Sequence, residues 1–347
     1  YTTGVFQDHV LKSTGLFAPV STALGAVLHL GLLALAFARR HQWPLFALAV
    51  LFFYASHVLE STVLNLELYF EHRNYLATAF LFLPLLVLAA DKLTRRASAI
   101  AATFVLLLLS GFTHYSATVW SDYNGMIEAS ARKAPTSARA QVLHALNLFN
   151  AGHHDASLQV IDRAIENIPT NDPLLLVNRA MIRCNLKLLE PAEVEFVVAH
   201  VAVRDYDPRY LKLYTSFVQS LSEKRCPAVD IAALQPLFAA MLGNPNNLEP
   251  GTTTLSHVHY LNGLVALKLG GRGTANRHFH QALEAKPDSS AAMSMAALMA
   301  TDGYFDEALA LADVALQQLD ARSRGVRFTA KVTEAEILAF QQVVRAD

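Results

Sequence analysis

The stretch GLVALKLGGRGTANRHFHQALEAKP, residues 263–287, decides the fold of the larger part of the chain. Six positions carry its pattern of small, turn, small, bulky, small and proline residues: Gly263, Gly270, Ala275, Phe279, Ala282 and Pro287. Small side chains at facing positions let two antiparallel helices approach closely, while bulky side chains fill the space toward the next pair. The stretch therefore predicts a helical hairpin that needs neighbouring hairpins to bury its apolar faces.

The pattern recurs along the chain. Residues 145–169 repeat it at Ala145, Gly152, Ser157, Ile161, Ala164 and Pro169. A later unit keeps the register at Ala296, Gly303, Ala308, Ala312 and Ala315. Residues 173–208 form a looser unit, in which we expect the inward positions to be Ala180, Ala192, Phe196 and Ala199, with Pro208 displaced. This spacing resembles the tetratricopeptide repeat (TPR), which implies an α-solenoid over residues 138–347 whose concave face binds a protein partner. The alternative is a domain that serves only as a dimerisation or docking platform.

The remaining parts of this region fit less well. Residues 209–255 predict a degenerate pair, with helices over Tyr210–Leu221 and Val229–Leu242, followed by an exposed loop GNPNNLEPGTTT at 243–254. Glu334–Val344 predicts a closing helix that covers the last apolar face.

The first third of the chain is poor in charge. Residues 1–120 hold seven of the 28 Lys and Arg residues and five of the 29 Asp and Glu residues. Hydropathy predicts four membrane-spanning helices there, at about residues 19–38, 43–59, 75–90 and 97–120. Four buried helices in a large soluble core are the alternative. The predicted fold class is thus all-α: a four-span transmembrane bundle, a linker at 121–137, and a TPR solenoid.

Basic residues set the predicted orientation. Arg39 and Arg40 separate the first two predicted spans, and Lys92, Arg95 and Arg96 separate the last two, so both connections should be cytoplasmic. The outer loop at 60–74 and the whole region after Trp120 then lie on the other side. This predicts a multi-pass protein of a bacterial inner membrane with a periplasmic repeat domain.

Charge and cysteine content exclude several functions. A net charge of −1 provides no basic field for nucleic acid.

Cys184 and Cys226, 42 positions apart, fit one disulfide in an oxidising compartment, or else two buried free thiols. No Cys and His spacing predicts a metal site, and no motif predicts a cofactor, although a need for a divalent ion stays open.

The outer loop concentrates ionisable residues beside two apolar segments. Such groups near hydrocarbon cost several kcal/mol, about 2.5 to 3.5 in insertion experiments, unless they are paired or hydrated, so they often mark sites. Arg73 offers a planar fork for phosphate, and Glu60 or Glu67 offers a carboxylate that can accept a hydroxyl proton. The alternative is a solvated loop whose charges pair with one another and with lipid headgroups.

The run ESTVLNLELYFEHRNYL, residues 60–76, resembles a signature of bacterial multi-pass membrane proteins with C-terminal TPRs, often labelled pilus-assembly-like. Their plan is similar to lipid-linked-sugar glycosyltransferases of the C superfamily. The resemblance implies a polyprenyl-phosphate sugar donor, catalytic residues Glu60, Glu67 and Glu71, and lipid-phosphate ligands His72, Arg73, Asn74 and Tyr75. Two departures are Asn65, where proline is usual, and Ala77-Thr78, where Pro-Ser is usual. The superfamily has more helices, which implies that this chain is the C-terminal half of a longer protein.

Three hypotheses follow. The first is a glycosyltransferase acting on a protein or glycan acceptor. The second is a non-catalytic membrane-anchored scaffold that recruits pilus or envelope components, and the third is an accessory subunit of a larger membrane complex.

Overall fold

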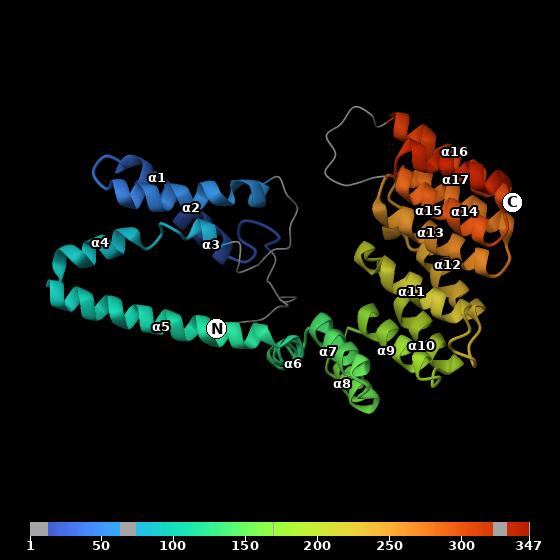
Figure 1. Cartoon of the computed structure of the whole chain (residues 1–347), viewed down its shortest axis with the longest axis horizontal. Coiled ribbons are helices and arrows are strands. Elements are labelled where there is room, and N and C mark those ends of the chain that lie inside the picture. The colour runs from blue at the N-terminus through green and yellow to red at the C-terminus, as the bar shows by residue number, and fades with distance from the viewer. Residues whose placement is uncertain (1–12, 63–73, 169, 322–331, 347) are drawn as a thin grey trace. The chain divides into compact units, whose positions relative to one another are not determined.

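The computed structural model describes residues 13–62, 74–168, 170–321 and 332–346, and within these ranges the regular elements are helices. The chain divides into two compact units, residues 1–137 and 138–347 (Figure 1).

The first unit contains six described helices: α1 (Ser21–Ala38), α2 (Pro44–Thr62), α3 (Asn74–Ala77), α4 (Leu83–Lys92), α5 (Arg95–Ser121) and α6 (Tyr123–Lys133). α1 packs beside α2, which also contacts α4. A hydrogen bond of 2.6 Å between His29 Nδ1 and the Tyr54 hydroxyl joins the first two helices. Apolar side chains such as Leu24 and Leu107 are exposed on α1 and α5.

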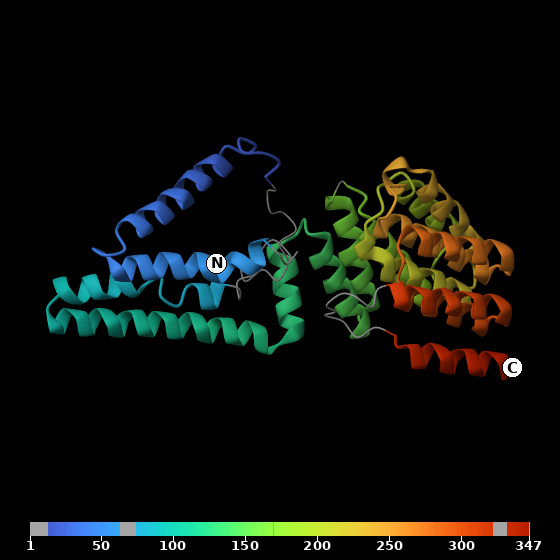
Figure 2. The ribbon, with the colours of Figure 1, turned by 90° about the horizontal axis from the view of Figure 1, so that it is seen from above.

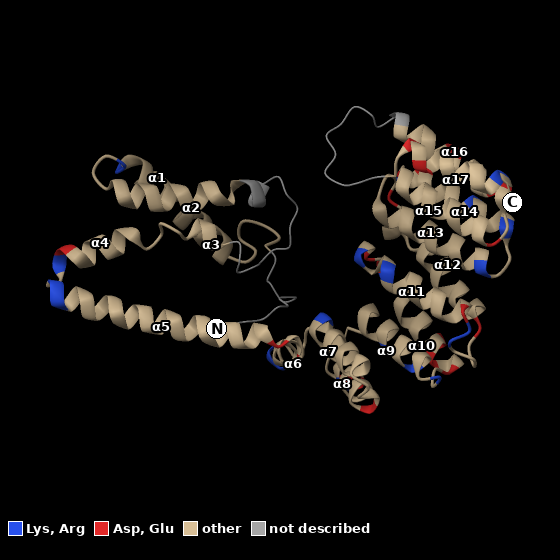
Figure 3. Ribbon diagram, in the orientation of Figure 1, with Lys and Arg blue, Asp and Glu red and all other residues tan. Residues whose placement is uncertain are grey.

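Two described helices, α1 and α5, are long and apolar enough to cross a membrane. α2 has a shorter apolar part, Pro44–Val58. Figure 3 shows both long helices nearly free of charge along their length, with basic residues at the α4–α5 connection. The described residues therefore give two candidate spans, where the sequence predicted four.

The predicted span at 75–90 is wrong as a continuous helix. It divides into α3 and α4, with turns between them. The Thr78 hydroxyl donates a 2.7 Å hydrogen bond to the Asn74 carbonyl, and Pro84 lies in the first turn of α4. Proline lacks an N–H and is accommodated at a helix start, so it favours a new helix over a continued one.

The predicted linker at 121–137 is largely helical. Asp122 caps α6, because its carboxylate oxygens accept hydrogen bonds of 3.1 Å from the backbone N–H groups of Asn124 and Gly125. Lys133 ends this helix.

The second unit is built from helix pairs. Its α-helices are α7 (Ala138–Asn150), α8 (His154–Asn167), α9 (Pro173–Asn185), α10 (Pro191–Val201), α11 (Leu211–Ser222), α12 (Gln235–Gly243), α13 (Thr253–Lys268), α14 (Arg272–Ala285), α15 (Ser289–Thr301), α16 (Phe305–Ala321) and α17 (Glu334–Ala346). Short 3₁₀ helices occur at η2 (Pro208–Tyr210), η3 (Ile231–Leu234) and η4 (Pro245–Asn247). Four pairs pack as hairpins: α7–α8, α9–α10, α13–α14 and α15–α16 (Figures 1 and 2). Between the second and third of them, α11 and α12 pack on η3 and α13, and every hairpin contacts the α-helix that follows it. This arrangement is an α-solenoid.

Three hairpins follow the repeat spacing closely. Their turns place Gly152, Gly270 and Gly303 at φ of 83°, 77° and 80°, a left-handed conformation that glycine adopts without steric cost. In each of them the second helix begins two residues after the glycine, at His154, Arg272 and Phe305. The small and bulky positions of the pattern are buried, with 0 to 3% exposure: Ala145, Ser157, Ile161, Ala164, Ala275, Phe279, Ala282, Ala296, Ala308, Ala312 and Ala315. The proline that ends the first of these patterns, at position 169, lies outside the described residues.

The α9–α10 hairpin departs from this spacing. Ala180 is buried as predicted, but Ala192, Phe196 and Ala199 are exposed, and Val194, Val197 and Val201 are buried instead. The turn residue in the left-handed conformation is Lys187, with φ of 60°, and α10 begins four residues after it. Two extra residues rotate the following helix by about 200°, which exchanges its inner and outer faces.

The irregular middle of the unit matches the predicted helices within a few residues, but the loop at 243–254 is more ordered than predicted. Asn247 is buried, and its side chain accepts a 2.9 Å hydrogen bond from the Tyr206 backbone N–H and donates one of 2.9 Å to the Met241 carbonyl. At the far end of the chain, α17 packs on α16 and buries Ile337 and Val344, as expected of a closing helix.

Candidate interaction surface

The predicted phosphate site lies mostly outside the described residues. This applies to Glu67, Glu71, His72 and Arg73, and to the side chain of Glu60, a residue of α2. Asn74 begins α3 and accepts the Thr78 hydrogen bond through its carbonyl, and Tyr75 is 76% exposed. Of the predicted phosphate ligands, the structure therefore describes only Asn74 and Tyr75.

The outer face of α10 carries an apolar stripe. It consists of Ala192, Phe196 and Ala199 on the helix and Val203 in the turn that follows, which are exposed and separated by four, three and four positions. Phe196 is 42% exposed and Val203, two residues after the helix ends, is 78% exposed. Spacing of this kind is the a/d repeat of helices that pack against another helix. We call these four residues the α10 stripe.

Polar groups border the α10 stripe. The His200 ring lies over the Phe196 ring, with centroids 3.9 Å apart, and its Nδ1 is 2.8 Å from the Phe196 carbonyl oxygen. Glu195 is exposed on the same helix. In the a/d register these two residues occupy flanking positions, where charged groups set the choice of partner.

Ion pairs fix α10 to the helix before it. Arg183 Nε donates a 2.7 Å hydrogen bond to Glu193, and Arg179 lies 3.7 Å from the other oxygen of that carboxylate. Arg179 also pairs with Asp162 of α8 at 2.6 Å. A capping box formed by Glu190 and Glu193 closes the start of α10. The helix that carries the stripe is therefore held at its first turn and along its inner face.

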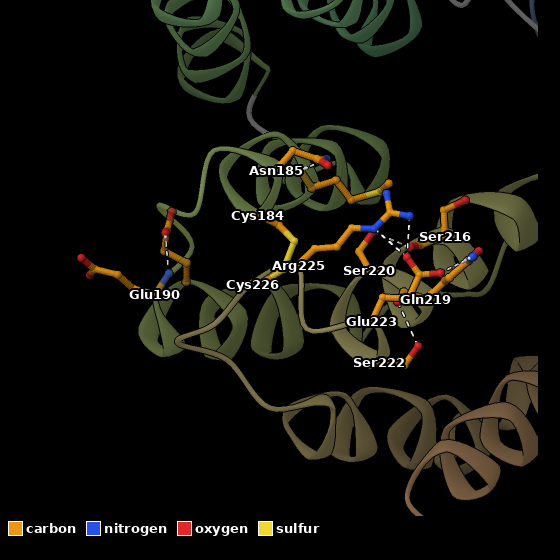
Figure 4. The surroundings of a disulfide bond; sticks show 12 residues. Cys184, Asn185, Glu190, Ser216, Gln219, Ser220, Ser222, Glu223, Arg225 and Cys226 are labelled. Carbon is orange, nitrogen blue, oxygen red and sulfur yellow. Dashed lines mark hydrogen bonds and ion pairs between the residues drawn. A yellow bond between two sulfur atoms is a disulfide. The ribbon is translucent and has the colours of Figure 1, made fainter.

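A disulfide strengthens the support beneath α10. Cys184, near the end of α9, is bonded to Cys226, which follows α11, and their Cα atoms are 4.8 Å apart. Figure 4 shows this bond together with Arg225, whose guanidinium donates to Glu223. α10 contacts both α9, which contains Cys184, and the η3 segment, which follows Cys226. The bond therefore links the two segments against which α10 packs.

An open depression of about 410 Å³ lies at the end of the stripe. Its lining residues are Asp172, Pro173, Val203, Arg204, Asp205 and Tyr210. Hydrogen bonds from the side chains of Asn246 and Asn244 lower the pKa of Asp205, so this carboxylate stays charged at neutral pH. The surface thus passes from an apolar stripe to a polar hollow at Val203.

Histidines gather on the α13–α14 hairpin. His257 Nδ1 lies 3.2 Å from the buried Tyr206 hydroxyl, whereas His259 Nδ1 lies 3.2 Å from His278 Nδ1 of α14. The two residues of α13 contact different neighbours, as their separation of two positions predicts. Burial lowers the pKa of all three histidines.

Sequence reasoning missed the α10 stripe because its residues looked like core positions. The signal was nevertheless present, because α10 has apolar residues on two faces. When one of these faces is buried in the core, the other stays exposed and can bind a partner.

Comparisons with known proteins found a distant structural likeness. No family model matches the chain, and no curated protein matches it. Among solved structures, the chain is similar to the crystal structure of a thermophilic TPR protein from Thermus thermophilus, with 21% identity over 60% of this chain and 100% of that one, at a TM-score of 0.33. The packing of successive helix pairs makes the second unit a solenoid.

Proposed function

We propose that this protein is a membrane-attached scaffold whose solenoid binds a helix of a partner protein. The observation that carries the proposal is the α10 stripe, an exposed a/d seam on a helix whose opposite face is fully used in the core. This stripe lies on the outer face of α10, whereas the repeat pattern had predicted binding on the concave face; exposed apolar patches and a/d seams mark sites where other helices pack.

The proposed occupant is an amphipathic helix with its own a/d apolar residues and a basic residue opposite Glu195. Ala192 and Ala199 are small, so a second helix can approach closely on either side of Phe196, which fills a hole between partner side chains. Aromatic residues near the centre of an interface contribute much of the binding energy. A seam of three turns is short, so we expect a transient complex rather than a permanent one.

Attachment to a membrane is the second part of the proposal. The apolarity and length of α1 and α5 support it. The basic residues at the α1–α2 and α4–α5 connections favour a cytoplasmic position for both turns, and under this proposal the solenoid lies in the periplasm.

In-cell photocrosslinking tests the scaffold. A photoreactive amino acid at Ala199 should give a discrete crosslink whose partner peptide is an amphipathic helix, and Phe196→Asp should abolish it. The matched control places the same probe at Gln159, an exposed residue of α8. A crosslink to a second copy of this chain, to lipid, or of equal strength from Gln159 would refute the proposed occupant. Formation of the Cys184–Cys226 bond in each variant reports that the solenoid has folded.

Sugar transfer from a polyprenyl phosphate is a second proposal, favoured by the run at residues 60–76 alone. Under this proposal Arg73 and His72 hold the phosphate and a glutamate activates the acceptor. Arg73→Ala and Glu71→Gln should then abolish glycan transfer at unchanged protein abundance. Transfer that persists in both variants would exclude this chemistry.

A further inference from the structure

His259 and His278 face each other across one hairpin. They come from α13 and α14, 19 positions apart, and their Nδ1 atoms are separated by 3.2 Å. Their ring centroids are 5.5 Å apart and the rings are inclined by 35°. Both residues are half-buried.

This separation matches the edge of a tetrahedral zinc site. Zinc binds imidazole nitrogen at about 2.0 to 2.1 Å, so two nitrogens on one tetrahedral ion lie about 3.3 Å apart. We propose that His259 and His278 bind a divalent zinc ion through their Nδ1 atoms. The ion takes the place of the hydrogen bond between the two nitrogens. The proton on the donating Nδ1 moves to Nε2 of the same ring, so both imidazoles stay neutral and no net proton is released.

The protonation state of the pair suits this role. Burial lowers the pKa of both imidazoles, and each is further lowered by a neighbouring charge, His278 for His259 and Arg277 for His278. Metal binding requires neutral imidazole, so little deprotonation work is needed at neutral pH. Arg277 acts against the ion, but its side chain is exposed and solvent screens it.

The hairpin also holds the two ligands in register. Gly263 of α13 lies against the Phe279 ring, next to His278, so the helices cannot slide without breaking this contact. Preorganised ligands on packed helices lose little entropy when an ion binds.

The site provides two protein nitrogens. Within the described ranges, no three His, Cys, Asp or Glu side chains gather to hold a metal, so water completes the coordination. Two other side chains act on the pair: Gln281 forms a hydrogen bond with His278, and the Glu284 carboxylate raises the pKa of His259. Two ligands predict modest affinity, and an ion with open positions can accept a further ligand.

The test is zinc titration of the full chain in detergent, stripped of metal and without an affinity tag. Isothermal titration should show one site that both His259→Ala and His278→Ala weaken by about tenfold or more. His280→Ala is the matched control, because His280 lies two residues from His278 on α14, and it should leave the affinity unchanged. Cobalt should give the visible spectrum of a tetrahedral ion in the wild-type protein and lose it in both ligand variants.

A wild-type protein with no zinc site, or one whose site persists in His259→Ala and His278→Ala, would overturn the proposal. His259→Gln provides a second variant that keeps a polar side chain, and circular dichroism before metal addition confirms that each variant is folded. The result is independent of the α10 stripe, so either proposal can fail alone.

Discussion

Gly263 shows how one missing Cβ sets the spacing of a helix pair. A Cβ at this position would lie 2.7 Å from two carbons of the Phe279 ring and 3.3 Å from the Ala275 carbonyl oxygen. Phe279 is itself fully buried, so the ring has no free space into which to move. The glycine is required for contact between helices rather than for a turn.

We expect Gly263→Ala to lower the free energy of unfolding by about 1 to 3 kcal/mol, because overpacking forces the helices apart. Gly273 provides the control: it lies in α14 with open space where its Cβ would be, so Gly273→Ala should stabilise by about 0.5 to 1 kcal/mol through helix propensity alone. Guanidinium titration followed by circular dichroism measures both. Equal effects of the two substitutions would contradict the close-contact explanation.

At the scale of single residues, the inner positions of three hairpins could be predicted because two signals agree. The glycine marks the turn between the helices, and the small residues mark the helix faces that pack together. It could not predict the His259–His278 pair, since nothing local relates residues 19 positions apart on different helices. The alanines of the α10 stripe were misassigned because small residues are equally compatible with close packing and with exposure.

At the scale of the elements, the position of α10 depends on the disulfide-linked segments against which it packs. The Cys184–Cys226 bond closes a segment with a sequence separation of 42, which includes α10 and α11. A crosslink over such a length restricts the unfolded chain, and the chain-entropy estimate is about 4 kcal/mol.

Replacing both cysteines by alanine should therefore lower the free energy of unfolding by about 2 to 4 kcal/mol. The change should equal the effect of reductant on the wild-type protein, while reductant should not affect the variant. Thermal melts of the four samples give the comparison. If reduction leaves the wild-type melting temperature unchanged, the bond contributes nothing to stability.

The helix boundaries show where local signals suffice. Asp172 and Asp288 cap α9 and α15 through their carboxylates, and these starts can be recognised in the sequence. The break between α3 and α4 also has a signal, Pro84 at the start of α4, but a prediction from hydropathy alone misses it because residues 75–90 are almost uniformly apolar.

For the whole molecule, the side of the membrane on which the solenoid lies is open to a direct test. Disulfides persist in oxidising compartments and are rare in the cytosol. If the solenoid is periplasmic, alkylation of intact bacteria quenched with acid should find Cys184 and Cys226 bonded, and the chain should stay in the membrane after carbonate extraction. Free thiols in cells, or release by carbonate, would contradict the proposed orientation or the attachment. A mutant lacking the periplasmic disulfide-forming oxidase should show the thiols reduced.

The turn before α10 shows that a change in chain length can create a contact surface without any change in composition. Two additional residues between Lys187 and Pro191 turn the helix by about 200°, so the valines enter the core and the alanines and Phe196 face solvent. Removing two residues from this turn should drive the helix back toward the opposite orientation, hiding Phe196 and displaying the valines. In helical arrays, insertions and deletions in the short connections can thus determine which face of a helix is exposed to solvent. New binding surfaces can then arise from residues that are already present in the helix.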